Sequence, residues 1–265
     1  MGAHVTTKEG VISVKGLSIS VSHLTPPRPR PDPAPVIVFL HEALGSVRQW
    51  KDFPARLCAE TRLHGLVMDR LGHGRSSPVP QPRSADYLRE EGEESLALAL
   101  RAAGIERPIL FGHSDGGSIA LYYAAAQPTT ALIAEAAHVF VEPVTLAGIR
   151  QFGNTWATTN VSQRLAMSHG DKTDALFHNW HDTWLSPAFS GFDMRDRLPK
   201  IACPSLIVQG ANDQYGSAAQ VQAIVAGIGA AAQGWIIPSC GHIPHFEHDV
   251  AVIRKASDFL HEVLR

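Results

Sequence analysis

A serine between closely spaced glycines is the clearest chemical signal in this sequence. The pentapeptide Gly-His-Ser-Asp-Gly at 112–116 follows the short apolar run 108–111 and precedes a helix-like run at 118–126. A strand, a sharp turn and a helix in this order expose a serine hydroxyl at the end of a sheet. The glycines let the strand and the helix approach each other closely. We therefore predict that Ser114 is a nucleophile.

A serine nucleophile needs a general base and a carboxylate that orients the base. After such a turn the acid and then the base are expected later in the chain, each in a loop at the carboxyl end of a strand. Asp213 follows the apolar run 205–208, and His242 follows the run 235–237. Asp213 and His242 are therefore the predicted acid and base. Glu142, which follows another strand-like segment, is the alternative acid.

The tetrahedral intermediate formed on such a serine requires hydrogen-bond donors for its oxyanion. One predicted donor is the backbone N–H of Asp115, the residue after the nucleophile, and the other is expected in the loop 41–46. Histidines at 242, 245 and 248 suggest a metal cluster on a simple count, but Pro244 interrupts the helical spacing that such a site uses. No metal site is therefore predicted.

Composition and charge exclude several classes of protein. The 265 residues carry a formal net charge of -2, which provides no basic field for nucleic acid. No apolar run reaches the length of a membrane span, and residues 1–16 lack the apolar core of a secretion signal. Three widely separated cysteines suggest free thiols in a reducing compartment. We expect a cytoplasmic protein with no nucleic-acid or membrane partner.

Strand-like and helix-like segments alternate along most of the chain. Continuous apolar runs typical of strands buried on both faces occur at 36–40, 65–68, 108–111, 131–141, 205–208 and 234–237. Residues 11–14 and 17–21 predict an antiparallel hairpin. Between 143 and 199 the alternation stops, and the segment is helical in character and rich in aromatic residues.

This pattern predicts an α/β fold with a mostly parallel, doubly wound sheet and an N-terminal antiparallel hairpin. Residues 1–142 and 200–265 form the predicted core. Residues 143–199 are the predicted helical insertion, lying over the carboxyl ends of the strands.

Four ordered motifs give the chain a resemblance to the α/β-hydrolase superfamily along nearly its whole length. They are Phe-Leu-His-Glu-Ala-Leu-Gly-Ser at 39–46, Asp-Arg-Leu-Gly-His-Gly-Arg-Ser at 69–76, the pentapeptide at 112–116, and Gly-Ala-Asn-Asp at 210–213 with Gly-His at 241–242. The chain most resembles the small lidded branch that contains carboxylesterases, thioesterases and carbon–carbon bond hydrolases of aromatic ring-cleavage products. The resemblance implies an oxyanion donor at the backbone N–H of Ala43 and a lid at 143–199.

The resemblance also reveals one departure. The family usually has glycine where this chain has Glu42, and a carboxylate pointing inward would oppose the negative charge of the intermediate. We expect Glu42 to point away, to pair with a base such as Arg70 or Arg75, or to bind the substrate. Because lids of this family form the substrate pocket, Phe177, Trp180 and Trp184 are predicted wall residues of that pocket. Trp50 is predicted to line its floor, and Glu42 is included as a substrate-binding group from the oxyanion loop.

These observations predict a carboxylesterase-like serine hydrolase that cleaves a small to medium, largely apolar ester or thioester through an acyl-enzyme. Neither a metal nor an organic cofactor is expected. One alternative is hydrolysis of a carbon–carbon bond in a vinylogous diketone. A second is a non-catalytic ligand-binding protein on the same fold, which only Glu42 favours. The expected partner is a small-molecule substrate, and the chain is expected to be a monomer or a homodimer.

Overall fold

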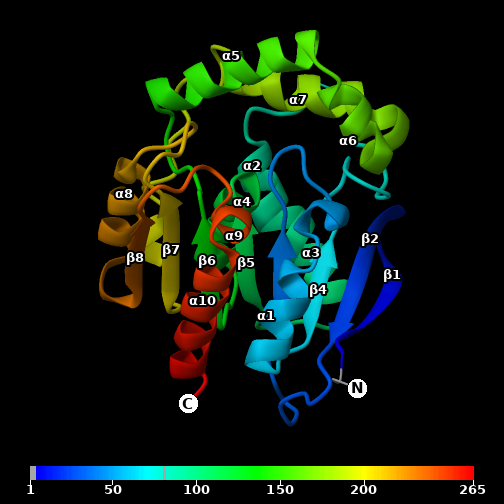
Figure 1. Cartoon of the computed structure of the whole chain (residues 1–265), viewed down its shortest axis with the longest axis vertical. Helices are drawn as coiled ribbons and strands as arrows, with labels where there is room; N and C mark the ends of the chain where they lie inside the picture. The colour runs from blue at the N-terminus through cyan, green and yellow to red at the C-terminus, as the bar shows by residue number, and fades with distance from the viewer. Residues whose placement is uncertain (1–3, 80–81) are drawn as a thin grey trace.

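An eight-stranded sheet forms the centre of the computed structural model, which describes residues 4–79 and 82–265 (Figure 1). Residues 1–3 and 80–81 of the predicted core lie outside the described residues. The strand order is β1-β2-β4-β3-β5-β6-β7-β8. The strands are β1 (Thr6–Val14), β2 (Leu17–Thr25), β3 (Ile37–Leu40), β4 (Gly65–Met68), β5 (Ile109–His113), β6 (Ala131–Glu135), β7 (Ser205–Gly210) and β8 (Ala232–Ile237).

Only the N-terminal edge of this sheet is antiparallel. β1 pairs with β2 across a turn at Lys15 and Gly16, and β2 pairs antiparallel with β4. All pairs from β4 through β3, β5, β6 and β7 to β8 are parallel. The apolar strands β3, β4, β5 and β6 are buried at every residue, as expected for strands covered on both faces. The predicted mostly parallel sheet with an antiparallel hairpin is confirmed.

Helices cover both faces of the sheet and create two separate hydrophobic cores. One core contains α1 (Phe53–Thr61) and α10 (Asp249–Val263), which pack against the same face (Figure 1). The other contains α2 (Tyr87–Glu90), a π-helical turn at Glu91–Leu96, and the helices α3 (Ala97–Ala102), α4 (Asp115–Ala126) and α8 (Ala218–Ile228). The short helix α9 (Pro244–Glu247) precedes α10.

Three helices form a further layer at one end of the sheet, at the top of Figure 1. They are α5 (Pro143–Thr158), α6 (Val161–His169) and α7 (Thr173–Leu185), and we call them the helical layer. Lys172 joins this layer to the loop that follows β4, because its Nζ donates to the carbonyl oxygens of Gly74 (2.7 Å) and Ser76 (2.5 Å). His169 accepts a hydrogen bond from the amide of Gly74 at 2.9 Å. The layer therefore lies over loops at the carboxyl ends of the strands.

One predicted strand is shorter than expected. The strand predicted at 131–141 ends at Glu135, because Ala136 adopts a positive φ of 51° and turns the chain out of the sheet. His138 therefore lies in a loop, where the sequence had indicated a strand.

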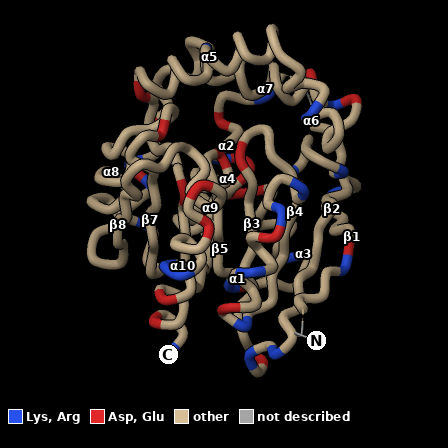
Figure 2. The backbone as a smooth tube through the Cα atoms, in the orientation of Figure 1, with Lys and Arg blue, Asp and Glu red and all other residues tan. Residues whose placement is uncertain are grey.

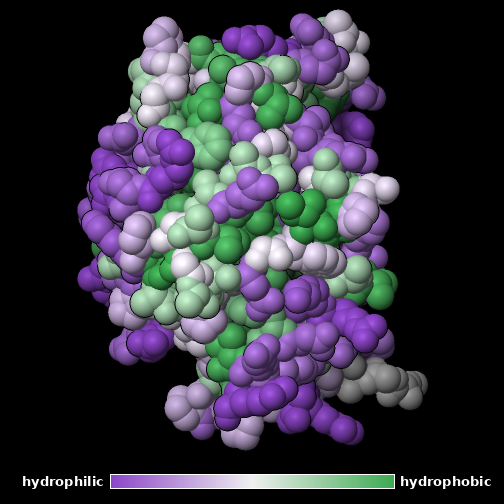
Figure 3. Space-filling model, turned by 90° about the vertical axis from the view of Figure 1, so that its left-hand side faces the viewer, coloured by the Kyte–Doolittle hydropathy of each residue, from purple (hydrophilic) through white to green (hydrophobic). Residues whose placement is uncertain are grey.

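The surface mixes residue types. Basic and acidic residues are interspersed along the backbone (Figure 2). On the face shown in Figure 3, hydrophobic and hydrophilic side chains are also intermingled. Among the helices of the described ranges, none combines the length and the apolar character that crossing a bilayer requires.

Candidate active site

Ser114 lies at the tight turn between β5 and α4. Its backbone has a φ of 54° and a ψ of -120°, in the left-handed half of conformational space that side chains rarely occupy. A Cβ on Gly112 would lie 2.2 Å from the carbonyl oxygen of Gly116, and a Cβ on Gly116 would lie 2.1 Å from that of Leu40. Strand and helix therefore approach so closely that both flanking positions require glycine.

A chain of hydrogen bonds leads from Ser114 to a buried carboxylate. The Oγ of Ser114 lies 3.0 Å from Nε2 of His242. The Nδ1 of His242 lies 2.9 Å and 2.8 Å from the two carboxylate oxygens of Asp213. Asp213 follows β7 and His242 follows β8, so two neighbouring strands place the two side chains beside the serine. This is the geometry that allows a histidine to take the proton of a serine hydroxyl.

Further hydrogen bonds hold Asp213 in its ionised form. Its carboxylate accepts from Nε2 of Gln209 at 2.5 Å and from the amide of Tyr215 at 2.7 Å. Burial by itself raises the pKa of Asp213, but the charge and hydrogen bond of His242 and the hydrogen bond from the amide of Tyr215 lower it below its usual value. An ionised Asp213 can stabilise the positive charge that His242 acquires when it accepts a proton.

Glu142, the alternative acid, has different partners. Its carboxylate accepts from the amide (3.0 Å) and hydroxyl (2.5 Å) of Ser217 and from Nε2 of Gln220 (2.8 Å). These donors lie at the start of α8, where the helix dipole favours a negative charge. Glu142 therefore caps α8, and His242 pairs with Asp213 instead.

The two predicted oxyanion donors face the same cavity as Ser114. Ala43 and Asp115 both line this cavity. Asp115 is the first residue of α4, so its amide has no acceptor within the helix. Within the described part of the chain, the amide of Ala43 donates to no protein oxygen. Both amides therefore remain available for a ligand.

The cavity has a volume of about 380 Å³ and lies between the strand ends and the helical layer. Of the predicted pocket residues, Glu42, Trp180 and Trp184 line it. The side chains that the helical layer contributes are mostly apolar: Thr145, Ile149, Phe152, Val161, Leu165, Trp180 and Trp184. His138, from the loop after β6, also lines it and lies beside His242 with a ring-to-ring distance of 6.2 Å.

Two predicted pocket residues lie elsewhere. Trp50 is buried on the opposite face of the sheet, where its ring packs against Phe53 and Phe111. Phe177 stacks on Trp156 with a ring-to-ring distance of 4.0 Å and an interplanar angle of 4°. Neither borders the cavity. The aromatic residues that recur along α7 in part form the interior of the helical layer itself, which the helical period alone cannot distinguish from a pocket wall.

Glu42 pairs with a histidine. Its carboxylate lies 3.5 Å from Nδ1 of His113, whose Nε2 donates to the backbone oxygen of His242 at 2.8 Å. The expected pairing of the Glu42 carboxylate with Arg70 or Arg75 is wrong, because Arg70 donates to its backbone oxygen and Arg75 pairs with Glu9. The partner of Glu42 comes from the end of β5.

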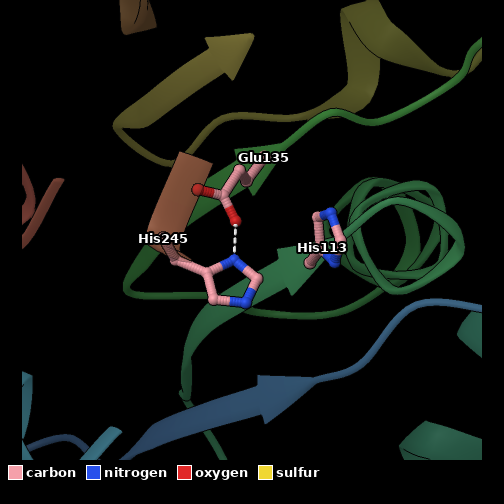
Figure 4. Close-up of side chains that lie close together, drawn as sticks. All are labelled: His113, Glu135 and His245. Atoms are coloured by element: carbon pink, nitrogen blue, oxygen red, sulfur yellow. Dashed lines mark hydrogen bonds and ion pairs between the residues drawn. The ribbon is translucent and has the colours of Figure 1, made fainter. Parts of the chain in front are cut away.

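This pair belongs to a buried cluster of titratable side chains beneath the site. His113, Glu135 and His245 come from the ends of β5 and β6 and from α9, and the ring of His245 hydrogen-bonds the carboxylate of Glu135 (Figure 4). Burial lowers the pKa of His113, but its contact with Glu42 and the charge of Glu135 outweigh this effect and raise it to about 9. Burial raises the pKa of Glu42, yet the contact and charge of His113 hold it well below its usual range. Glu42 and His113 are therefore an ion pair at neutral pH.

The ligand-type atoms of His113, Glu135 and His245 lie within 4.8 Å of one another, a spacing that a metal ion can bridge. However, one ring nitrogen of His113 binds a carbonyl oxygen, and one of His245 binds Glu135. The protein itself therefore already occupies part of this donor set. The hydrogen-bonding pattern supports a cluster that positions the His242 loop through the contact of His113 with the backbone oxygen of His242.

A second buried group was not expected from the sequence. The indole Nε1 of Trp184 donates to the hydroxyl of Tyr87 at 2.8 Å, and this hydroxyl donates to the carboxylate of Asp115 at 2.6 Å. The helical layer is thus hydrogen-bonded to the residue after Ser114. No motif marks Tyr87 or His113. The only available signal was the position of His113 and Asp115 on either side of the serine. Side chains at these two positions are directed away from the reacting atoms, so each needs a partner elsewhere in the protein.

Known proteins resemble this chain in sequence and in fold. A sequence profile described as the alpha/beta hydrolase family matches residues 37–255. Over 90 residues the chain is 38% identical to 2-succinyl-6-hydroxy-2,4-cyclohexadiene-1-carboxylate synthase of Yersinia pestis (strain Pestoides F). This match covers only 34% of the chain and 30% of that protein.

Solved structures resemble the whole chain at low sequence identity. With 2-hydroxy-6-oxo-6-phenylhexa-2,4-dienoate hydrolase from Rhodococcus sp. strain RHA1 the TM-score is 0.80 and the identity 14%, over 97% of this chain and 99% of that one. With proline iminopeptidase from Mycobacterium smegmatis the TM-score is 0.73 and the identity 18%, over 97% and 98% of the two chains. At this identity the likeness concerns the fold alone.

Proposed function

This chain belongs to the alpha/beta hydrolase family, and we propose that it is a serine hydrolase that cleaves a small to medium, largely apolar ester or thioester. One observation carries the proposal. The hydrogen-bonded series Ser114, His242 and Asp213 opens onto a mostly apolar cavity of about 380 Å³. Cavities of this size and composition suit small organic ligands.

In the proposed reaction, the Oγ of Ser114 attacks the acyl carbonyl while Nε2 of His242 accepts the hydroxyl proton. Backbone N–H groups of Ala43 and Asp115 stabilise the oxyanion. His242 then donates the proton to the leaving alcohol or thiol, and an acyl-enzyme remains. Water, deprotonated by the same His242, attacks this ester and releases the acid and Ser114.

We propose that the helical layer, which lies within the predicted insertion at 143–199, acts as a lid over the site. Its apolar side chains, including Trp180 and Trp184, provide one wall of the cavity. Closing an apolar wall over the substrate excludes water and strengthens the electrostatic interactions at the reacting atoms. We infer that the lid sets the length of the acyl or leaving group that the site accepts.

The proposal is tested with a series of nitrophenyl esters of increasing acyl length and with a fluorophosphonate probe. Turnover is expected to be greatest for short to medium acyl chains, and intact mass should show one probe adduct on Ser114. Ser114→Ala should abolish both. Turnover that survives this substitution would overturn the assignment of the nucleophile.

The same experiment separates the alternatives. A protein that the probe labels, but that hydrolyses a vinylogous diketone and no ester, would be a carbon–carbon bond hydrolase. A protein that shows neither labelling nor turnover, yet binds small apolar ligands, would be a non-catalytic binding protein.

A further inference from the structure

Glu42 places a carboxylate in the wall of the cavity that contains Ser114. Its side chain is 29% exposed, and the residue lines the cavity together with Ala43 and Ser114. The closest charged group is Nδ1 of His113, at an ion-pair distance of 3.5 Å, and no residue of the described chain donates a hydrogen bond to the carboxylate. Its oxygens are therefore free to accept hydrogen bonds from a ligand.

The ion pair is oriented. The side chain of His113 is only 1% exposed, against 29% for that of Glu42, and His113 belongs to the buried cluster that includes Glu135 (Figure 4). Glu42 is thus the member of the pair that faces the ligand. The positive charge behind it offsets its repulsion of the oxyanion, which explains how a carboxylate is tolerated beside the oxyanion loop.

The remaining wall of the cavity favours a cation. Among the described residues that line it there is no lysine or arginine. An anionic substrate would therefore be removed from water without a cationic partner, at a large desolvation penalty. Aromatic rings of Phe152, Trp180, Trp184 and Tyr215 line the same cavity, and such rings attract cations through their faces.

We propose that Glu42 determines the charge of the substrate, so that the site prefers an ester or thioester bearing an ammonium group and rejects one bearing a carboxylate. This inference rests on the proposed function and narrows it. It also separates this chain from the dienoate hydrolase of Rhodococcus, whose named substrate is a carboxylate.

The experiment uses thioesters of matched chain length whose terminal group is cationic, neutral or anionic, the cationic and neutral members being isosteres. For the leaving group these are the butyryl thioesters of thiocholine, of its neutral isostere 3,3-dimethylbutanethiol, and of 3-mercaptopropionate. For the acyl group they are the phenyl thioesters of 4-(trimethylammonio)butyrate, of its isostere 5,5-dimethylhexanoate, and of glutarate. The released thiol is measured for the wild type, for Glu42→Gln, and for the control Glu94→Gln, which removes a surface carboxylate.

In at least one of the two series, leaving group or acyl group, the wild type should show a kcat/KM about tenfold higher for the cation than for its isostere. Its kcat/KM for the anion should be about tenfold lower than for the isostere. In Glu42→Gln the kcat/KM values for the cation and for the anion should each come within about threefold of the value for the isostere. Glu94→Gln should keep the wild-type ratios. If the wild type shows nearly equal kcat/KM for the cation, the isostere and the anion in both series, the proposal is wrong, whether or not Glu42→Gln folds. A cation preference that persists in a folded Glu42→Gln would also overturn the proposal.

Binding distinguishes this failure from failure of the proposed function. Calorimetry of the same thioesters with Ser114→Ala, and with the double variant Ser114→Ala/Glu42→Gln, measures the charge preference without turnover. A cation preference in binding that disappears in the double variant supports the role of Glu42 even if no thioester is hydrolysed. Equal binding of cation and isostere to Ser114→Ala would contradict it.

Discussion

Ser114 keeps an unfavourable backbone conformation because its surroundings leave no room for another. Its amide donates to the carbonyl oxygen of Glu135 on the neighbouring strand at 2.8 Å. On either side, Gly112 lets β5 approach α4, and Gly116 lets α4 approach the end of β3. Such strain persists only where neighbouring structure determines the conformation completely. Here it directs the hydroxyl toward His242.

Asp213→Asn should lower kcat by about 10³- to 10⁴-fold, because the amide of Asn can hold His242 in the wrong tautomer and carries no charge. Glu142→Gln should leave kcat within about threefold of the wild type, since its carboxylate binds Ser217 and Gln220 at the start of α8. Steady-state ester hydrolysis measures both. A large loss in Glu142→Gln together with normal turnover in Asp213→Asn would transfer the role of the acid to Glu142.

The pKa of His113 makes the stability of the fold depend on pH. In the folded protein this pKa is raised from the ordinary 6.5 to about 9, so the fold favours the protonated ring. Its contribution is complete below about pH 6.5 and is lost as the pH rises through about 9. Because Glu42 is partly exposed, the contribution is discounted to about 2 kcal/mol.

The free energy of unfolding of the wild type should therefore fall between about pH 6 and about pH 9.5, and that of His113→Gln should fall about 2 kcal/mol less over this interval. Urea denaturation at both pH values provides the measurement. Identical pH dependence in the two proteins would show that His113 is not protonated in the fold.

At the scale of elements, one hydroxyl connects the helical layer to the turn that carries the nucleophile. Tyr87 of α2 accepts from Trp184 of α7 and donates to Asp115 of α4. All three side chains are buried. Burial and the nearby carboxylate of Asp115 raise the pKa of Tyr87, so its hydroxyl keeps the proton that it donates. The lid wall and the predicted oxyanion donor therefore share one support.

Tyr87→Phe should lower the free energy of unfolding by about 2 kcal/mol, because it leaves the indole N–H of Trp184 and the carboxylate of Asp115 buried without this partner. Tyr122→Phe is the control, since the hydroxyl of Tyr122 has no hydrogen-bond partner in the described structure. Urea denaturation of both variants is the measurement. Equal, small effects would show that the hydroxyl of Tyr87 is not needed to satisfy its neighbours.

At the scale of the whole molecule, a single sheet separates two cores. Leu57 of α1 belongs to one core and Leu100 of α3 to the other, and both are fully buried. Because strands such as β3 and β5 contribute alternate side chains to both faces, neither core can lose its packing without exposing the same strands. We therefore expect the two cores to unfold together, in one cooperative transition.

Leu57→Ala and Leu100→Ala should each lower the stability by about 2–5 kcal/mol through loss of buried methyl groups and formation of a cavity. Each variant should still unfold in one transition, with the slope of the wild type and with the same midpoint by tryptophan fluorescence and circular dichroism. Two separate transitions in either variant would show that the two cores unfold independently.

The sequence by itself determined the sheet and the positions of Ser114, Asp213 and His242 at the ends of its strands. These features depend on local rules. Continuous apolar runs predict buried parallel strands, and the carboxyl ends of parallel strands meet at one edge of a sheet. Glycines on both sides of a serine indicate a close strand-to-helix turn. The hydrogen bonds that join the three side chains are what the structure adds.

Only the tertiary structure decided which partners the remaining residues acquire. The pairing of Glu42 with His113 joins a loop to the end of β5, far apart in the chain, and the Tyr87–Trp184 contact joins the core to the helical layer. Neither leaves a periodic signal, because such contacts depend on how completed elements pack. For the same reason, the helical period could not show that Trp180 faces the cavity while Phe177, three residues earlier, faces the interior of the layer.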